Sequence, residues 1–214
     1  MSANLKISAA LVAVFVVGLA VFGVVRTRDG GDEPAAARAA VTREDSHRLS
    51  TAEDGRVTLV EFLDFECESC LAAYPFIQEL RQTYDGRVTF VARYFPMPGH
   101  RNAENAAVAV EAAAQQDRFE EMYDRMYETQ SQWGESQDSQ AAVFRGFAEE
   151  MGLDLAAFDA AVADPETLER VLQDREDGIT LGVEGTPTFF LNGEKLTVTS
   201  TDEFIEQLDA ALAG

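Results

Sequence analysis

The two cysteines of this chain stand three positions apart, in the sequence Cys67-Glu68-Ser69-Cys70. Two thiols at this spacing in the first turn of a helix can close a small disulfide ring, and reopen it, with little backbone movement. A sulfur at a helix N-terminus faces unpaired backbone N–H groups and the positive end of the helix dipole, which favour the thiolate. We therefore predict that Cys67 is the attacking sulfur and that Cys70, one turn deeper, resolves mixed disulfides.

Three other interpretations of the two cysteines stay open. An inert structural bridge is disfavoured because so short a loop removes little entropy from the unfolded chain. A metal site would use the two histidines, His47 and His100, which lack finger-like spacing. Two buried, unpaired thiols would leave the spacing unexplained, whereas C-x-x-C between a strand and a helix is a redox signature.

A strand is predicted just before the dithiol. Residues 57–63 are rich in β-branched and aromatic side chains and almost entirely apolar, which is typical of a central strand covered on both faces. Glu61 is the exception, because an ionised carboxylate is costly to bury and burial raises its pKa. We predict that Glu61 lies beneath the dithiol and exchanges a proton with Cys70. The alternative is a solvated glutamate at a sheet edge.

A second strand pattern and a set of helices follow. Residues 185–196 contain a Pro-led apolar strand, an Asn-Gly turn signal and a short second strand, which together predict a β-hairpin. Roughly ninety residues separate the two halves, far more than an ordinary connection. Spaced apolar residues among Ala, Glu and Gln predict an inserted helical lobe at about residues 100–182, with helices over residues 102–116, 119–130, 139–151, 155–162 and 165–181.

These features resemble the thioredoxin superfamily: a C-x-x-C after a strand, an acidic residue six positions before the first cysteine, and Thr186-Pro187 before a hairpin. The stretch from Arg93 to His100, followed by an Ala-rich helix, is similar to the insertion entry of the DsbA-like branch. The resemblance covers residues 57–212 and implies an α/β thioredoxin fold, a central mixed β-sheet flanked by helices, with an inserted all-helical lobe.

The resemblance also implies site residues. Pro187 is expected to be cis and to face the dithiol, and the backbone of Thr186 to pair with an extended substrate segment. The predicted catalytic residues are Cys67, Cys70 and Glu61, and the predicted substrate-binding residues are Glu68, Ser69, Thr186 and Pro187. His100 is expected to be a loop residue without a catalytic role, and the alternative is that it shapes the groove near the dithiol.

One departure from the family concerns oxidising strength. Strongly oxidising members have histidine just before the second cysteine, where this chain has Ser69. Glu66 and Glu68 place negative charge on both sides of Cys67, which is expected to oppose ionisation and raise the pKa of its thiol. We therefore expect a moderate reduction potential.

The N-terminus predicts membrane attachment. Residues 7–25 form an uncharged stretch of 19 residues, close to the roughly 20 that span a bilayer and long for a signal-peptide core. We predict an N-terminal transmembrane helix within residues 1–28, with cleavage as a signal peptide the alternative. Residues 29–55, rich in Gly, Ala and charge, are a predicted flexible linker, and residues 56–214 a predicted single domain.

The net charge and the predicted cellular location limit the partners that this protein can have. The formal net charge of −21 argues against nucleic acid. The family implies no bound cofactor or metal, and it implies that the tethered domain is extracytoplasmic and introduces disulfides into exported proteins. It also implies reoxidation by a membrane quinone-linked thiol oxidase. Charges flanking the stretch do not set its orientation. A tethered reductase for cytochrome maturation or thiol repair, and a non-catalytic client-binding or holdase module, remain alternatives.

Overall fold

The computed structural model describes residues 41–214. The predicted membrane anchor, residues 1–28, and residues 29–40 of the predicted linker lie outside the described residues. Within residues 41–214, no helix is both long enough and apolar enough to cross a membrane.

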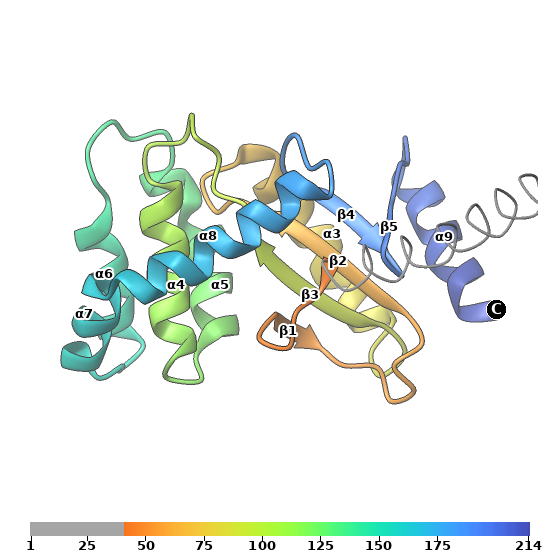
Figure 1. Cartoon of the computed structure of the whole chain (residues 1–214), viewed down its shortest axis with the longest axis horizontal. Coiled ribbons are helices and arrows are strands. Elements are labelled where there is room, and N and C mark those ends of the chain that lie inside the picture. The colour runs from red at the N-terminus through yellow and green to blue at the C-terminus, as the bar shows by residue number, and fades with distance from the viewer. Residues whose placement is uncertain (1–40) are drawn as a thin grey trace, which may run out of the picture. The chain divides into compact units, whose positions relative to one another are not determined.

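A mixed sheet of five strands forms the centre of the described chain (Figure 1). β2 and β3 run parallel, and every other neighbouring pair is antiparallel. In spatial order the strands are β1 (His47–Ser50), β3 (Thr89–Tyr94), β2 (Thr58–Leu63), β4 (Thr188–Leu191) and β5 (Glu194–Lys195). Central β2 confirms the strand predicted over residues 57–63. β4 and β5 form the predicted hairpin, with Asn192 and Gly193 at φ of 52° and 86° in its turn.

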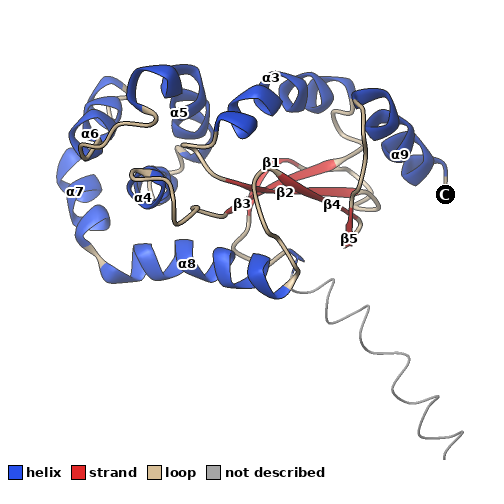
Figure 2. Ribbon diagram, turned by 90° about the horizontal axis from the view of Figure 1, so that it is seen from above, coloured by secondary structure: helices blue, strands red, loops and turns tan. Residues whose placement is uncertain are grey.

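Helices cover both faces of the sheet (Figure 2). α3 (Glu68–Thr83) and α9 (Thr201–Ala213) lie on one face, and α8 (Pro165–Thr180) lies on the other. Side chains alternate along a strand, so Leu59 and Leu63 of β2 pack with the α3 core, whereas Val60 and Phe62 pack toward α8. The same alternation puts Glu61 on the face covered by the helix that carries the dithiol.

The region between β3 and β4 is helical. α4 lies in the middle of this lobe and contacts the four helices that follow it. Its small side chains, including the fully buried Ala106 and Ala113, let these neighbours approach closely. The helices are α4 (Ala103–Ala114), α5 (Phe119–Trp133), α6 (Ala141–Glu150), α7 (Leu155–Ala163) and α8. All five occur where the sequence predicts helices, with ends shifted by a few residues.

Helix α8 approaches the sheet closely at Gly178. A Cβ atom at this position would lie 2.6 Å from the ring of Phe95 and 3.1 Å from that of Phe62. Real side chains do not tolerate the shorter distance, so the two rings occupy space that only glycine leaves free. Gly178 therefore sets how closely the lobe and the sheet pack.

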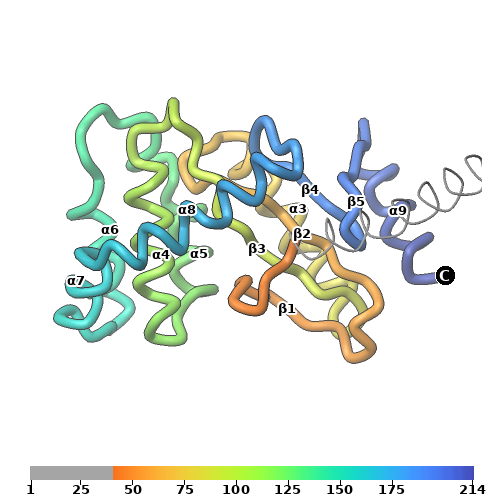
Figure 3. Tube along the Cα trace, viewed as in Figure 1, coloured from red at the N-terminus to blue at the C-terminus, as the bar shows by residue number. Residues whose placement is uncertain are grey.

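The folded domain begins earlier than predicted, because residues 41–55 are not a linker. β1 pairs antiparallel with β3, with Arg48 opposite Val91, and Leu49 is buried. Figure 3 shows this segment running along the sheet. The prediction of a linker through residue 55 is therefore wrong for residues 41–55. A strand of four residues with one core side chain is too short to produce a periodic signal among charged neighbours.

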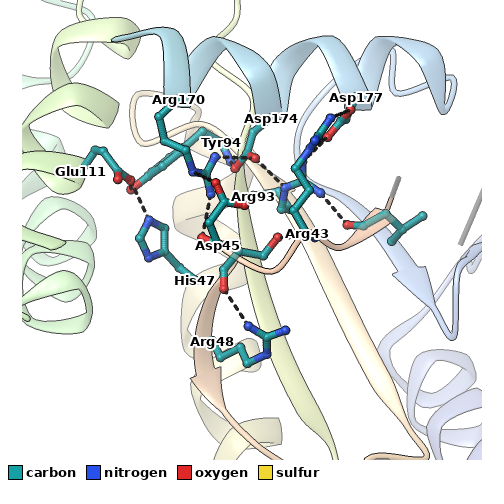
Figure 4. Close-up of polar contacts among 12 residues, drawn as sticks. Arg43, Asp45, His47, Arg48, Arg93, Tyr94, Glu111, Arg170, Asp174 and Asp177 are labelled. Carbon is teal, nitrogen blue, oxygen red and sulfur yellow. Dashed lines mark hydrogen bonds and ion pairs between the residues drawn. The ribbon is translucent and has the colours of Figure 1, made fainter. Parts of the chain in front are cut away.

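Ion pairs fasten this N-terminal segment to α8 and β3 (Figure 4). The wholly buried Arg93 of β3 pairs with Asp174 at 2.7 Å and with Asp177 at 2.5 Å, both on α8. Arg43 donates from Nη2 to Asp177 at 2.7 Å, and Arg93 also donates to the carbonyl oxygen of Val41 at 2.8 Å. One guanidinium thus joins the sheet, the last helix of the lobe and the start of the described chain.

Candidate active site

The dithiol lies at the start of α3, shortly after β2 ends. Cys67 is the N-cap residue of α3, and Cys70 lies in the first turn of that helix. Both are free thiols in the structure, with Cys67 9% exposed and Cys70 1% exposed. The chain therefore presents one sulfur near the surface and keeps the other inside, which is the arrangement that the sequence predicts.

The Cys67 sulfur is strongly acidified. A hydrogen bond with the Cys70 thiol is the largest contribution, and Thr186 and the backbone N–H groups of Cys70 and Ser69 add to it. Against the opposing effect of burial, these interactions lower the pKa of Cys67 to about 5. A thiol with this pKa is a thiolate at neutral pH, which is the form that attacks disulfides and leaves easily from them.

The flanking glutamates do not act as expected. The carboxylate of Glu66 accepts hydrogen bonds from the backbone N–H of Asn102 at 2.5 Å and of Glu135 at 3.1 Å, and the residue is 3% exposed. Glu68 is exposed to solvent. The expectation that the two charges raise the pKa of Cys67 is therefore wrong, because one carboxylate is engaged with distant loops and the other is screened by water.

Glu61 and Cys70 share the buried face of the sheet. Glu61 is 6% exposed, which excludes the solvated edge position. Burial, followed by the negative charge of Cys67, raises the pKa of Glu61 to about 8. Burial is also the main cause of the raised pKa of Cys70, and the charge of Glu61 contributes to it. The charge of Cys67 acts on Glu61 and the charge of Glu61 acts on Cys70, which places the carboxyl in the environment of the dithiol.

The residues that lead into the β4–β5 hairpin lie beside Cys67. The Thr186–Pro187 peptide bond is cis, as the family resemblance implies. In its protonated form the Cys67 thiol donates a hydrogen bond to the carbonyl oxygen of Thr186, with 3.3 Å between the sulfur and the oxygen. Cys67 and Thr186, which are 119 positions apart in the chain, therefore meet at the Cys67 sulfur.

A polar cavity of about 340 Å³ opens next to Cys67. It contains the predicted substrate-binding residues Glu68 and Ser69, and also His100 and Arg101, which were not among the predicted site residues. The lining residues are Glu66, Cys67, Glu68, Ser69, Gly99, His100, Arg101, Glu135 and Gln137. Loops from three separate parts of the chain thus surround the sulfur.

Buried polar residues that the sequence analysis missed hold these loops. Asp64 accepts hydrogen bonds from the backbone N–H of Glu66 at 2.8 Å and of Met97 at 2.9 Å, and it contacts His100 Nδ1 at 2.6 Å. Gln130 of α5 donates to the carbonyl oxygen of Cys67 at 3.0 Å. The signal for Asp64 was its position directly after a buried strand and three residues before the first cysteine.

The metal alternative has no support from the histidines. His47 bonds to Glu111 with 2.6 Å between Nε2 and the carboxylate, whereas His100 bonds to Asp64. In the part of the chain that the structure describes, no three His, Cys, Asp or Glu side chains form a group able to hold a metal ion.

Comparisons with known proteins agree with this architecture. A family model described as thioredoxin matches residues 46–210. Among curated relatives, the Na⁺/H⁺ antiporter NhaA 3 of Salinispora tropica is 36% identical over 152 residues, which is 71% of this chain and 22% of that protein. The antiporter NhaA of Herminiimonas arsenicoxydans is 32% identical over 91% of this chain, which is 30% of its own length. The chain thus spans less than a third of these curated relatives.

Solved structures share the fold. The structure of α-DsbA1 from Wolbachia pipientis matches with a TM-score of 0.72 and 16% identity, over 83% of this chain and 96% of that one. A thioredoxin-like oxidoreductase from Silicibacter pomeroyi matches with a TM-score of 0.68 and 25% identity, over 83% and 98% of the two chains. Both the sheet and the helical lobe are needed to reach this coverage. The chain therefore belongs to the thioredoxin family, and it shares the fold of the solved DsbA structure.

Proposed function

We propose that this domain works outside the cytoplasm and introduces disulfides into exported proteins. The observation that carries the proposal is the contrast between the two sulfurs, since Cys67 has a pKa of about 5 whereas the pKa of the buried Cys70 is raised. A stabilised thiolate stabilises the reduced form of the enzyme, and a stable reduced form makes the oxidised form a good oxidant.

The proposed reaction starts from the oxidised enzyme, with a disulfide between Cys67 and Cys70. A client thiolate attacks the Cys67 sulfur, because Cys70 is 1% exposed and out of reach. The bond between the two enzyme sulfurs breaks, Cys70 takes the electron pair, and a mixed disulfide joins Cys67 to the client. A second client thiolate then attacks the client sulfur, and Cys67 leaves as a thiolate. The client loses two electrons and the enzyme gains two.

Glu61 has a defined task in the first step. The departing Cys70 thiolate is buried, where its charge is costly. Burial, the larger cause of the raised pKa of Glu61, also acts in the oxidised enzyme, so Glu61 can hold a proton and pass it to this sulfur. In the reverse direction Glu61 takes the proton back as the enzyme is reoxidised. The exchange keeps the number of buried negative charges constant.

Client binding is proposed for the surface around Cys67. The backbone of Thr186 offers an edge to an extended client segment, beside the cis Pro187. Exposed Glu68 and Ser69 lie in the same cavity as Cys67, so they meet the residues that flank the client cysteine. No bound cofactor enters this scheme, because the dithiol itself carries the electrons.

Location and redox partner rest on the sequence. The uncharged stretch of residues 7–25 supports a single-pass membrane anchor, and the family resemblance supports a domain outside the cell membrane. Clients in that compartment would supply the thiols. A membrane quinone-linked thiol oxidase, which the family resemblance implies, would return Cys67 and Cys70 to the disulfide.

The test is the reduction potential of the full chain in detergent, equilibrated in glutathione buffers. Free thiols at Cys67 and Cys70 are quantified by alkylation and mass spectrometry. A potential well above that of the glutathione couple supports disulfide formation. A value near or below that of thioredoxin, about −270 mV, would instead assign the chain to the reductases. A Cys67→Ala variant with full cellular function would favour a client-binding module.

A further inference from the structure

A buried carboxylate holds a histidine at the mouth of the active-site cavity. The Asp64 side chain is completely buried, whereas that of His100 is 35% exposed. The distance between Asp64 Oδ2 and His100 Nδ1 is 2.6 Å. Because Nδ1 is taken by Asp64, the other ring nitrogen, Nε2, is on the side away from this contact. His100 and Cys67 line the same cavity of about 340 Å³.

The anchoring of Asp64 makes this position rigid. Its carboxylate also accepts hydrogen bonds from the backbone N–H of Glu66 at 2.8 Å and of Met97 at 2.9 Å. One of these amides belongs to the loop that leads into the dithiol, and the other belongs to the loop that carries His100. Asp64 therefore fixes the imidazole and the dithiol loop with one side chain.

We propose that His100, held by Asp64, is a positioning residue that supplies a positive charge to the Cys67 thiolate. The proposal rests on the thiol-disulfide exchange proposed above and adds a residue to it. The chain has Ser69 at the position between the cysteines where strongly oxidising relatives have histidine. Here the cation comes from a loop more than thirty residues downstream.

The charges around His100 favour its protonated form. Burial lowers the pKa of His100, but its hydrogen bond with Asp64 and the charges of Asp64, Cys67 and Glu66 outweigh burial and raise it. Glu68 and Glu135 add negative charge at the rim of the cavity. Arg101 is the opposing cation on the same loop.

Linkage makes the proposal reciprocal. If the imidazolium stabilises the thiolate, the thiolate must raise the pKa of His100 by the same amount. Closing the disulfide removes the thiolate, so oxidation is expected to lower the pKa of His100. Reduction of the enzyme near neutral pH is then accompanied by partial proton uptake at His100.

The first experiment is an NMR titration of the histidine ring protons in the full chain, reduced and oxidised. The expected result is a pKa of His100 higher by about half a unit in the reduced protein, a threefold change in the protonation equilibrium. His47, the other histidine, is the internal control because it bonds to Glu111 away from the cavity. Equal pKa values of His100 in the two states would overturn the proposal.

The second experiment measures the same coupling through the pKa of Cys67. His100→Gln can keep a hydrogen bond to Asp64 but has no charge, and thiolate absorbance at 240 nm is expected to show a pKa of Cys67 raised by about half a unit. Arg118→Gln is the control, since it removes a positive charge at the far end of α5, about 18 Å along the helix from Gln130. An unchanged pKa of Cys67 in His100→Gln, or an equal rise in both variants, would refute the role.

The coupling between His100 and Cys67 and the proposed oxidase direction of the reaction can be rejected independently of each other. A reducing potential in the wild-type chain with a normal coupling would reject only the proposed oxidase function. A high potential without coupling would reject only the role of His100.

Discussion

The acidity of Cys67 predicts how the reduction potential depends on pH. Reduction of the disulfide takes up two protons when both product sulfurs are thiols, but one when Cys67 stays a thiolate. For a two-electron couple, each proton changes the potential by about 30 mV per pH unit. Raising the pH should therefore lower the potential by about 59 mV per unit below pH 5 and by about 30 mV per unit above it.

The size of the effect follows from the pKa of Cys67, about 5. At pH 7, ionisation of such a thiol lowers the free energy of the reduced protein by about 2.7 kcal/mol, compared with a thiol of ordinary pKa. This free energy corresponds to about 60 mV of added oxidising strength. The hydrogen bond with Cys70 and the amides at the start of α3 are the structural origin of this increment.

The assay is equilibration of the full chain with glutathione or lipoate buffers between pH 3.5 and pH 7, followed by acid quenching and alkylation. A break in slope close to pH 5 is expected. An independent titration of thiolate absorbance should give the same midpoint. A constant slope of about 59 mV per pH unit across the whole range would mean that Cys67 is protonated at neutral pH, and would refute the reasoning.

Three further predictions concern single side chains. Glu61→Gln removes the proton donor beneath the dithiol and is expected to slow reduction of the enzyme disulfide by a client about 100-fold at pH 7 in stopped-flow measurements; an unchanged rate would exclude proton transfer by this residue. Arg93→Met leaves buried carboxylates without their cation and should cost about 3–5 kcal/mol in urea unfolding, whereas Arg145→Met, which breaks an exposed pair, should cost less than about 1 kcal/mol. Equal losses would contradict the role of the buried cluster. Gly178→Ala should destabilise the domain by about 1–3 kcal/mol because of overpacking. The helical control Gly146→Ala, whose new Cβ meets no neighbouring element within 4 Å, should stabilise the domain by up to about 1 kcal/mol. If calorimetry finds the same melting temperature for both variants, the close approach of α8 to the sheet at Gly178 is contradicted.

The parts of the fold that the sequence predicted have strong local signals. The apolar run of β2, the Asn-Gly turn at residues 192–193 and the helical patterns each depend on neighbouring residues. β1 was missed because it is stabilised by pairing with β3, more than forty residues away in the sequence. Arg93 interrupts an apolar strand, and its partners on α8 lie more than eighty residues downstream. Pairing over such distances leaves no local pattern.

The site residues also differ in whether a local sequence pattern predicts their role. Cys67, Cys70, Glu61 and Pro187 belong to spaced motifs that can be recognised in one sequence. The charge of Glu66 was misjudged because a sequence does not show which distant amides a carboxylate will meet. His100 was expected to be a loop residue, and its contact with the buried Asp64 and its place in the cavity beside Cys67 depend on residues distant in the sequence.

Glu66 is buried and hydrogen-bonded whereas its neighbours Glu68 and Ser69 are exposed, and this difference determines which of the three can be replaced without loss of folding stability. Glu66 ties two loops to the start of α3, whereas Glu68 and Ser69 are exposed. Substitutions at these two positions are therefore expected to change the surface that meets a client while the folding stability stays nearly constant. The choice of client could thus change at the edge of the dithiol without loosening the loops that Glu66 holds.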